Sequence, residues 1–175
     1  MKLNNRGMTL VEMIVAFAIL GIVSASIFSM MLTGTKTYTK LTNTVKVQYD
    51  AQLASAKIEK NILNCNDAIY WTDNLIVMVQ DNTVHAYKLD TTTKTLSYGT
   101  ETLDGEGKAT LTMHMLAEYV ESMRIVSPAT VSAGEKVKYV QLNMYFKRND
   151  KEYTMDKAVS LRNMPIFKMY DVTIP

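Results

Sequence analysis

The feature of this sequence that most limits what it can fold into is an uncharged, apolar segment near the N-terminus. Residues 13–35 contain no Asp, Glu, Lys or Arg. An α-helix rises 1.5 Å per residue, so about 20 such residues cross a hydrocarbon core of about 30 Å. One carboxylate, Glu12, directly precedes the segment. A charged side chain at the centre of a membrane helix costs about 2.5–3.5 kcal/mol, so an acid beside this segment indicates a specific partner.

Three simpler roles for the segment each fail to account for one of its features. A secretory signal peptide with a cleavage site at Ser24-Ala25-Ser26 would have an apolar part of only about 7–15 residues. A plain signal anchor fits the length equally well but gives Glu12 no role. A buried core helix would need more covering bulk than the rest of the chain offers. We therefore expect a membrane-spanning helix, and because the segment before it is short, we expect the long polar remainder outside the cytoplasm.

Composition predicts one small domain beyond this helix. The chain has 175 residues, of which 47% are hydrophobic and 21% charged, and this balance is typical of a globular protein rather than a disordered one. Cys65 is the only cysteine, so an intramolecular disulfide cannot form, and we expect a small buried hydrophobe rather than a reactive thiol. Of the 19 Lys and Arg, Lys2 and Arg6 precede the apolar segment, so the rest balances 17 basic against 17 acidic side chains. Net charge therefore does not indicate a polyanion-binding surface.

The helical pattern continues past residue 35. Apolar side chains recur every three or four residues, with lysines on other faces, which indicates an amphipathic helix. These apolar positions are Tyr38, Leu41, Val45, Tyr49, Leu53 and Ala56. We predict one helix over about 9–63, its first half apolar all round and its second half packing this stripe on a sheet. Gly21 and Gly34 are the expected bending points.

From Asn64 onward, short apolar runs alternate with turn residues, as expected for antiparallel strands. Two runs of the later part alternate apolar and polar side chains around the turn at 148–151. The predicted strands are 75–80, 84–89, 95–98, 109–115, 119–126, 137–147 and 153–161. The fold class that follows is α+β, a long N-terminal helix packed against an antiparallel β-sheet.

The N-terminus resembles that of type IV prepilins and type II secretion pseudopilins. The resemblance is carried by a short basic leader, a small residue at a cleavage position, and a glutamate five residues further on: Gly7-Met8-Thr9-Leu10-Val11-Glu12. It implies that a membrane-embedded prepilin peptidase cuts after Gly7 and methylates the new amino group of Met8. It also implies a division into a leader (1–7), a membrane and filament-core half-helix (8–35), an amphipathic half-helix (36–63) and a β-rich head (64–175).

The resemblance gives Glu12 a role. Extraction of the helix from the bilayer into a filament would carry its carboxylate and the amine of Met8 into an apolar bundle. Leaving one member of a buried ion pair without its partner costs about 3–5 kcal/mol. We therefore expect Glu12 to pair with the N-terminal amine of a neighbouring subunit and to act as the assembly residue.

The ending Val159-Ser160-Leu161-Arg162-Asn163-Met164-Pro165 is similar to that of minor pilins and pseudopilins of the J or W type, and Arg162 is expected to bridge to the end of the last strand. The function implied is a structural filament subunit for secretion, adhesion, motility or DNA uptake. The expected partners are the prepilin peptidase, other pilins and a membrane assembly platform, with nucleic acid left open. The alternative is a membrane-anchored binding domain that does not polymerise.

No enzyme, cofactor or metal site is expected. His85 and His114 lie in strand-like runs without a nucleophile pattern, and residues 104–107 supply too few oxygens for a calcium loop, so turn chemistry accounts for them.

Overall fold

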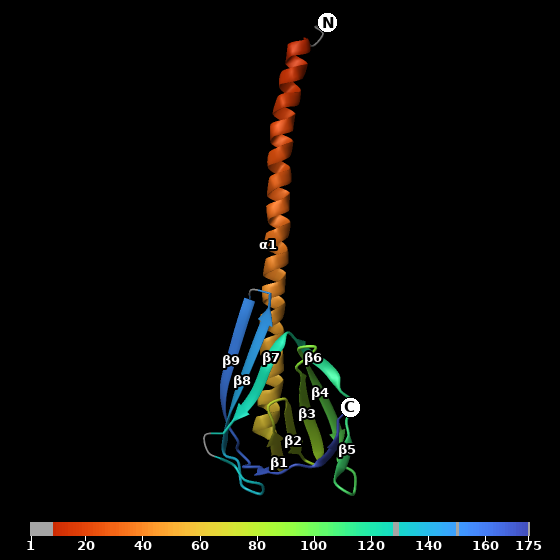
Figure 1. Cartoon of the computed structure of the whole chain (residues 1–175), viewed down its shortest axis with the longest axis vertical. Helices are drawn as coiled ribbons and strands as arrows, with labels where there is room; N and C mark the ends of the chain where they lie inside the picture. Colours follow the sequence, from red (N-terminus) through yellow and green to blue (C-terminus); the bar gives the residue numbers. More distant parts are fainter. Residues whose placement is uncertain (1–8, 128–129, 150, 175) are drawn as a thin grey trace, which may run out of the picture. The chain divides into compact units, whose positions relative to one another are not determined.

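The computed structural model describes residues 9–127, 130–149 and 151–174. Helix α1 covers Leu10–Asn64 and confirms the long helix predicted from the sequence. The chain divides into two compact units after Asn43, and α1 contributes residues to both (Figure 1).

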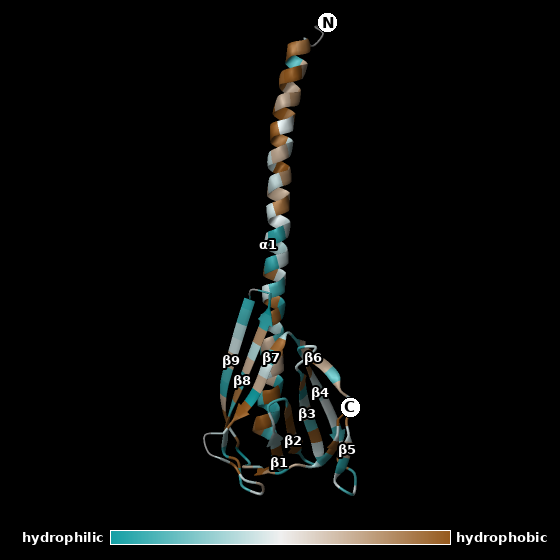
Figure 2. Cartoon of the chain, viewed as in Figure 1, coloured by the Kyte–Doolittle hydropathy of each residue, from teal (hydrophilic) through white to brown (hydrophobic). Residues whose placement is uncertain are grey.

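The described residues of the first unit, 9–43, belong to α1 from Leu10 onward, and all of them except Asn43 are exposed. Its apolar stretch is long enough to cross a membrane by length and composition, and Figure 2 shows the high hydropathy of this part of α1. Hydroxyl groups within the stretch bond back to carbonyls one turn earlier. Ser26 Oγ donates to the carbonyl oxygen of Ile22 at 3.0 Å, and Thr35 Oγ1 donates to that of Met31 at 2.6 Å. These hydroxyls therefore need no water, which suits a helix in a bilayer.

The second unit contains two larger sheets and one small one. The six-stranded sheet has the order β10-β1-β2-β3-β4-β6, and the three-stranded sheet has the order β7-β8-β9. A further pair, β5 and β11, runs parallel. The strands are β1 Ala68–Trp71, β2 Leu75–Gln80, β3 Thr83–Asp90, β4 Thr95–Thr102, β5 Lys108–Thr110, β6 His114–Glu118, β7 Val120–Val126, β8 Tyr139–Arg148, β9 Lys151–Ser160, β10 Ile166–Phe167 and β11 Asp171–Thr173.

Most predicted strands are confirmed, and the exceptions have local causes. The hairpin of β2 and β3 turns at Asp81 and Asn82, whose φ angles of 47° and 66° match a two-residue turn of the type favoured in hairpins. The expected strand 109–115 is wrong, because β5 and β6 are separate strands in different sheets. Strands β1, β10 and β11 were not predicted. Both β10 and β11 pair in parallel, so the sheet arrangement is not antiparallel throughout.

The main core lies along one side of the second half of α1 and includes residues of both larger sheets, whose strands are labelled in Figure 1. The helix buries a stripe of small and branched residues spaced three or four apart: Val47, Ala51, Ala54, Ile58 and Ile62. The predicted packing stripe is therefore wrong. Tyr49 and Leu53 from that stripe remain 63% and 45% exposed. Alanines allow the sheets to approach the helix closely, so the large apolar residues are left on the opposite side.

The other face of the six-stranded sheet has its own apolar cluster, which includes Val77, Val84 and Leu111. The segment around Leu111 crosses β4 at Gly99, where an added Cβ would lie 3.0 Å from the carbonyl oxygen of Thr112. Shortly after β9, Asn163 Nδ2 donates to the carbonyl oxygen of Cys65 at 3.4 Å. Arg162, the expected bridge, is exposed and makes no such contact with described residues.

Candidate assembly site

Glu12 closes the first turn of α1 through reciprocal contacts with Thr9. The backbone N–H of Thr9 donates to Glu12 Oε2 at 2.8 Å, and Thr9 Oγ1 donates to the same oxygen at 2.9 Å. In the other direction, the N–H of Glu12 donates to Thr9 Oγ1 at 3.3 Å. This is a capping box, in which two backbone N–H groups that lack helical partners are satisfied by the side chains at its two ends.

The capping role of Thr9 was not predicted, although the spacing Thr9-x-x-Glu12 is its signature. Glu12 therefore has a structural partner within its own chain. Both contacts to Thr9 use Oε2, while Oε1 has no hydrogen-bond or ion-pair partner among the described residues. The predicted processing residues, Gly7 and Met8, lie outside the described residues.

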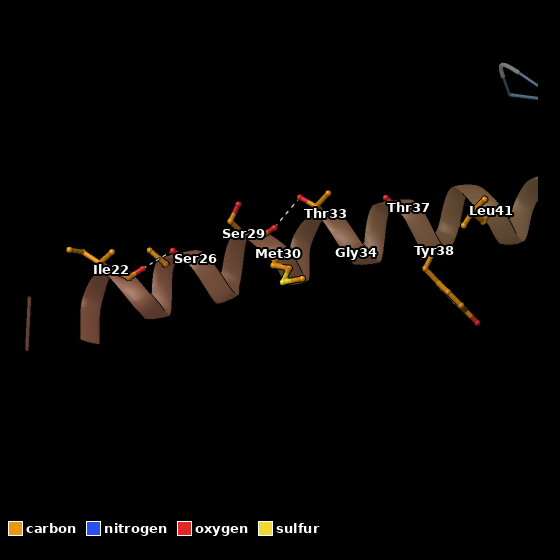
Figure 3. A pocket seen from close by; sticks show the side chains of 10 residues that line it. Ile22, Ser26, Ser29, Met30, Thr33, Gly34, Thr37, Tyr38 and Leu41 are labelled. Atoms are coloured by element: carbon orange, nitrogen blue, oxygen red, sulfur yellow. Dashed lines mark hydrogen bonds between the residues drawn. The ribbon is translucent and has the colours of Figure 1, made fainter. Parts of the chain in front are cut away.

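A shallow groove runs along α1 in the first unit, shown in Figure 3. Small residues recur every four positions along it, at Ala25, Ser29, Thr33 and Thr37. The dashed lines in the figure mark the bonds from Ser26 to Ile22 and from Thr33 to Ser29, which turn the hydroxyls back onto the helix. Small side chains at this spacing allow a second helix to approach closely inside a membrane.

In the second unit, α1 still presents large apolar side chains to solvent. Val45, Tyr49 and Leu53 are spaced four apart and are 61%, 63% and 45% exposed. No described residue covers this side of the helix, which lies opposite the buried stripe that begins at Val47.

Other groups that could carry chemistry have structural roles. Cys65 is fully buried, its thiol donates to the carbonyl oxygen of Ala68 at 3.0 Å, and burial raises its pKa to about 12, which confirms the expectation of an unreactive residue. Asp104 Oδ1 accepts the N–H groups of Glu106 and Lys108 at 2.9 and 2.8 Å, so it shapes the turn at 104–107. Within the described residues, no group of three or more His, Cys, Asp or Glu could hold a metal ion.

Comparison with known proteins identifies the N-terminal segment. A family model described as the prokaryotic N-terminal methylation motif matches residues 2–34. This range includes Gly7, Met8 and the capping pair, together with most of the apolar half of α1. Neither a curated protein nor a solved structure matches the chain. The N-terminal segment therefore carries the methylation motif of type IV prepilins and pseudopilins, and the long apolar helix packed with a β-rich unit is consistent with a type IV pilin-like α+β fold.

Proposed function

We propose that this protein is a structural subunit of a type IV pilus-like filament, assembled through α1 after removal of residues 1–7. In this proposal residues 8–35 form the filament core, the β-rich unit lies outside the cytoplasm, and the protein has no enzymatic activity. The ending Leu161-Arg162-Asn163 favours a minor subunit of the J or W type.

The observation that carries the proposal is the exposed apolar side of α1 in the second unit. A helix that only anchors a domain needs apolar residues within the bilayer, which residues 13–35 already supply. Val45, Tyr49 and Leu53 lie beyond that segment and are exposed, although a monomeric domain gains nothing from large apolar side chains aligned in water. Packing against helices of neighbouring subunits would bury them. The groove of small residues in the first unit supports the same arrangement within the membrane-spanning part.

The geometry at Glu12 supports a double role for its carboxylate. A carboxylate can accept about four hydrogen bonds, and the capping box uses only Oε2. Oε1 is thus left to pair with the amine of Met8 from a neighbouring subunit without opening the first turn of the helix. Assembly would then join two charges that cannot be buried separately.

Three substitutions distinguish the role of Glu12 in capping α1 from its proposed role in pairing with the amine of a neighbouring subunit. Glu12→Gln keeps an oxygen that accepts the Thr9 N–H but removes the charge, whereas Glu12→Ala removes both. Thr9→Ala removes the hydroxyl from the capping box and keeps the charge. We expect all three to be cleaved, Glu12→Gln and Glu12→Ala to be lost from sheared filaments, and Thr9→Ala to be incorporated. Immunoblots of filament and membrane fractions measure this.

If the Glu12→Gln variant is incorporated into filaments as well as the wild type, the proposed ion pair is contradicted, because a neutral acceptor would then be sufficient for assembly. If the wild-type protein never leaves the membrane fraction in a cell that makes the filament, the anchored, non-polymerising domain is the better description.

A further inference from the structure

A polar groove of about 450 Å³ lies in the second unit, between the last turns of α1 and the hairpin of β2 and β3. It is separate from the assembly site described above. Lysine, carboxamide, carboxylate, hydroxyl and imidazole groups line it, on Lys60, Asn61, Asn64, Gln80, Asp81, Thr83 and His85.

The strands become polar at the place where the helix ends. On the side of β3 that faces α1, Leu89 and Tyr87 are buried in the main core, and the next positions on the same side are His85 and Thr83. In β2, the buried Met78 is followed on that side by Gln80. The sheet therefore extends beyond its apolar contact with the helix and forms a polar floor.

Some of the polar groups in the groove are held by the fold, and others are free to bind a ligand. Asn61 Nδ2 donates to the hydroxyl of Tyr87 at 2.8 Å, and His85 Nδ1 lies 2.9 Å from the hydroxyl of Tyr98. These contacts fix the wall and floor. In contrast, the side chains of Lys60, Asn64 and Thr83 have no hydrogen-bond or ion-pair partner in the described part of the chain.

Charge in and around the groove favours an anion. Lys60 lines it, and the ammonium of Lys57 lies beside it, 3.6 Å from the ring centroid of Tyr98. The one acid in the lining, Asp81, accepts a hydrogen bond from the side-chain amide of Asn66 at 2.6 Å, and its own N–H donates to Asn66 Oδ1 at 3.1 Å. Gln80 Nε2 also donates to Asp81 Oδ2 at 3.5 Å. Asp81 keeps its negative charge and formally offsets Lys60, so the positive charge of Lys57 leaves these three groups with a net charge of +1.

We propose that this groove binds an acidic saccharide of the uronate type. Lys60 would pair with the sugar carboxylate. Asn64, Gln80 and Thr83 would bond the ring hydroxyls, because carboxamides and hydroxyls both donate and accept, as sugar hydroxyls do. A bare anion such as phosphate needs donors only, so the carboxamide and hydroxyl oxygens of the groove would have no partner on it.

The test is calorimetric titration of the full-length protein in detergent micelles with an oligogalacturonate. A neutral maltooligosaccharide of the same length tests the need for charge, and inorganic polyphosphate tests charge alone. We expect saturable binding of the oligogalacturonate only. Lys60→Gln should weaken it by about tenfold or more, since it removes a hydrogen bond from a charged donor. Thr83→Val, which keeps the shape and β-propensity of the side chain, should weaken it by a few-fold.

The matched control is Lys151→Gln, which removes an exposed lysine from β9 in the other sheet. It should leave the affinity unchanged, and all three variants should unfold at the wild-type temperature. The proposal is overturned by an absence of saturable binding to the wild-type chain, by equal losses in Lys60→Gln and Lys151→Gln, or by polyphosphate binding as tightly as the oligogalacturonate.

Discussion

At the scale of single residues, His85 links the stability of the second unit to pH. Burial, followed by the nearby charge of Lys57, lowers the pKa of His85 below its ordinary value of about 6.5. The unfolded chain thus binds a proton at a higher pH than the folded chain. The stability that neutral His85 contributes is complete above about pH 6.5 and is lost as the pH falls through the lower pKa of the folded state. Lys57 and Tyr98 are the groups that contact this site from α1 and β4.

We expect the unfolding temperature of the full chain in micelles to fall as the pH is lowered from about 7.5 to about 5, and His85→Gln to reduce this slope. The effect should be small, because the ring is only half-buried. The carboxylates with lowered pKa values, such as Glu118 and Glu152, titrate below this window. Thermal unfolding followed by circular dichroism measures how the unfolding temperature depends on pH. Equal slopes for the variant and the wild type would mean that groups other than His85 cause the loss of stability in acid.

Some features of single residues could be predicted from the sequence, and others could not. The burial of Cys65 followed from its chemistry and its place near the end of a helix. Glu12 was predicted to be a site residue because a charge beside an apolar segment needs a partner. The predicted partner was the amine of another subunit, whereas the capping contact with Thr9 of the same chain was not predicted. The polar groove was not predictable, because it requires that Lys60 and Asn64 of α1 lie opposite Thr83 of β3, and sequence spacing does not fix that contact.

At the scale of elements, α1 was predictable in extent but not in orientation. The absence of proline and the uninterrupted helical pattern defined its length. Two apolar stripes, however, share its second half, one with the large side chains of Tyr49 and Leu53 and one with Ala51, Ala54 and Ile58. Side-chain size favoured the first stripe, whereas close packing between two sheets buries the second. The short parallel strands β10 and β11 also depend on tertiary contacts, and they were missed because their partners are distant in sequence.

The exposed stripe yields a prediction at this scale. The double substitution Tyr49→Ser and Leu53→Ser should lower the amount of protein in sheared filaments several-fold, because it removes apolar area that only neighbouring subunits would bury. Each exposed site should change the free energy of unfolding by no more than about 0.5 kcal/mol. Met169→Ser is the matched control, since Met169 is 65% exposed and apolar but lies outside α1. Equal filament content in the double variant and the control would mean that this side of the helix is not an interface.

At the scale of the whole molecule, the first unit is suited to an apolar environment and the second unit is a folded domain with its own core. The first unit bonds hydroxyls such as those of Ser26 and Thr35 within its own helix and carries no charge over residues 13–35, so it suits lipid and equally a bundle of apolar helices. The second unit holds its core without a disulfide, by packing one side of the helix against two sheets. In the proposed function, the first unit would pass from the membrane into a filament while the fold of the second unit stayed the same.

The proposed transfer would require processing, which gives the last prediction. Produced together with a prepilin peptidase, the protein should yield an N-terminal peptide that begins at Met8 and carries the added mass of one methyl group. Without the peptidase, the peptide should begin upstream and retain Gly7. Gly7→Val should block cleavage, because a β-branched side chain prevents the close backbone approach that glycine allows. Mass spectrometry of the membrane fraction measures all three. A mature chain that begins at Met1 in the presence of active peptidase, or one released after Ser26, would make residues 13–35 an ordinary anchor or a secretory signal. No amine of Met8 would then be available to pair with Glu12.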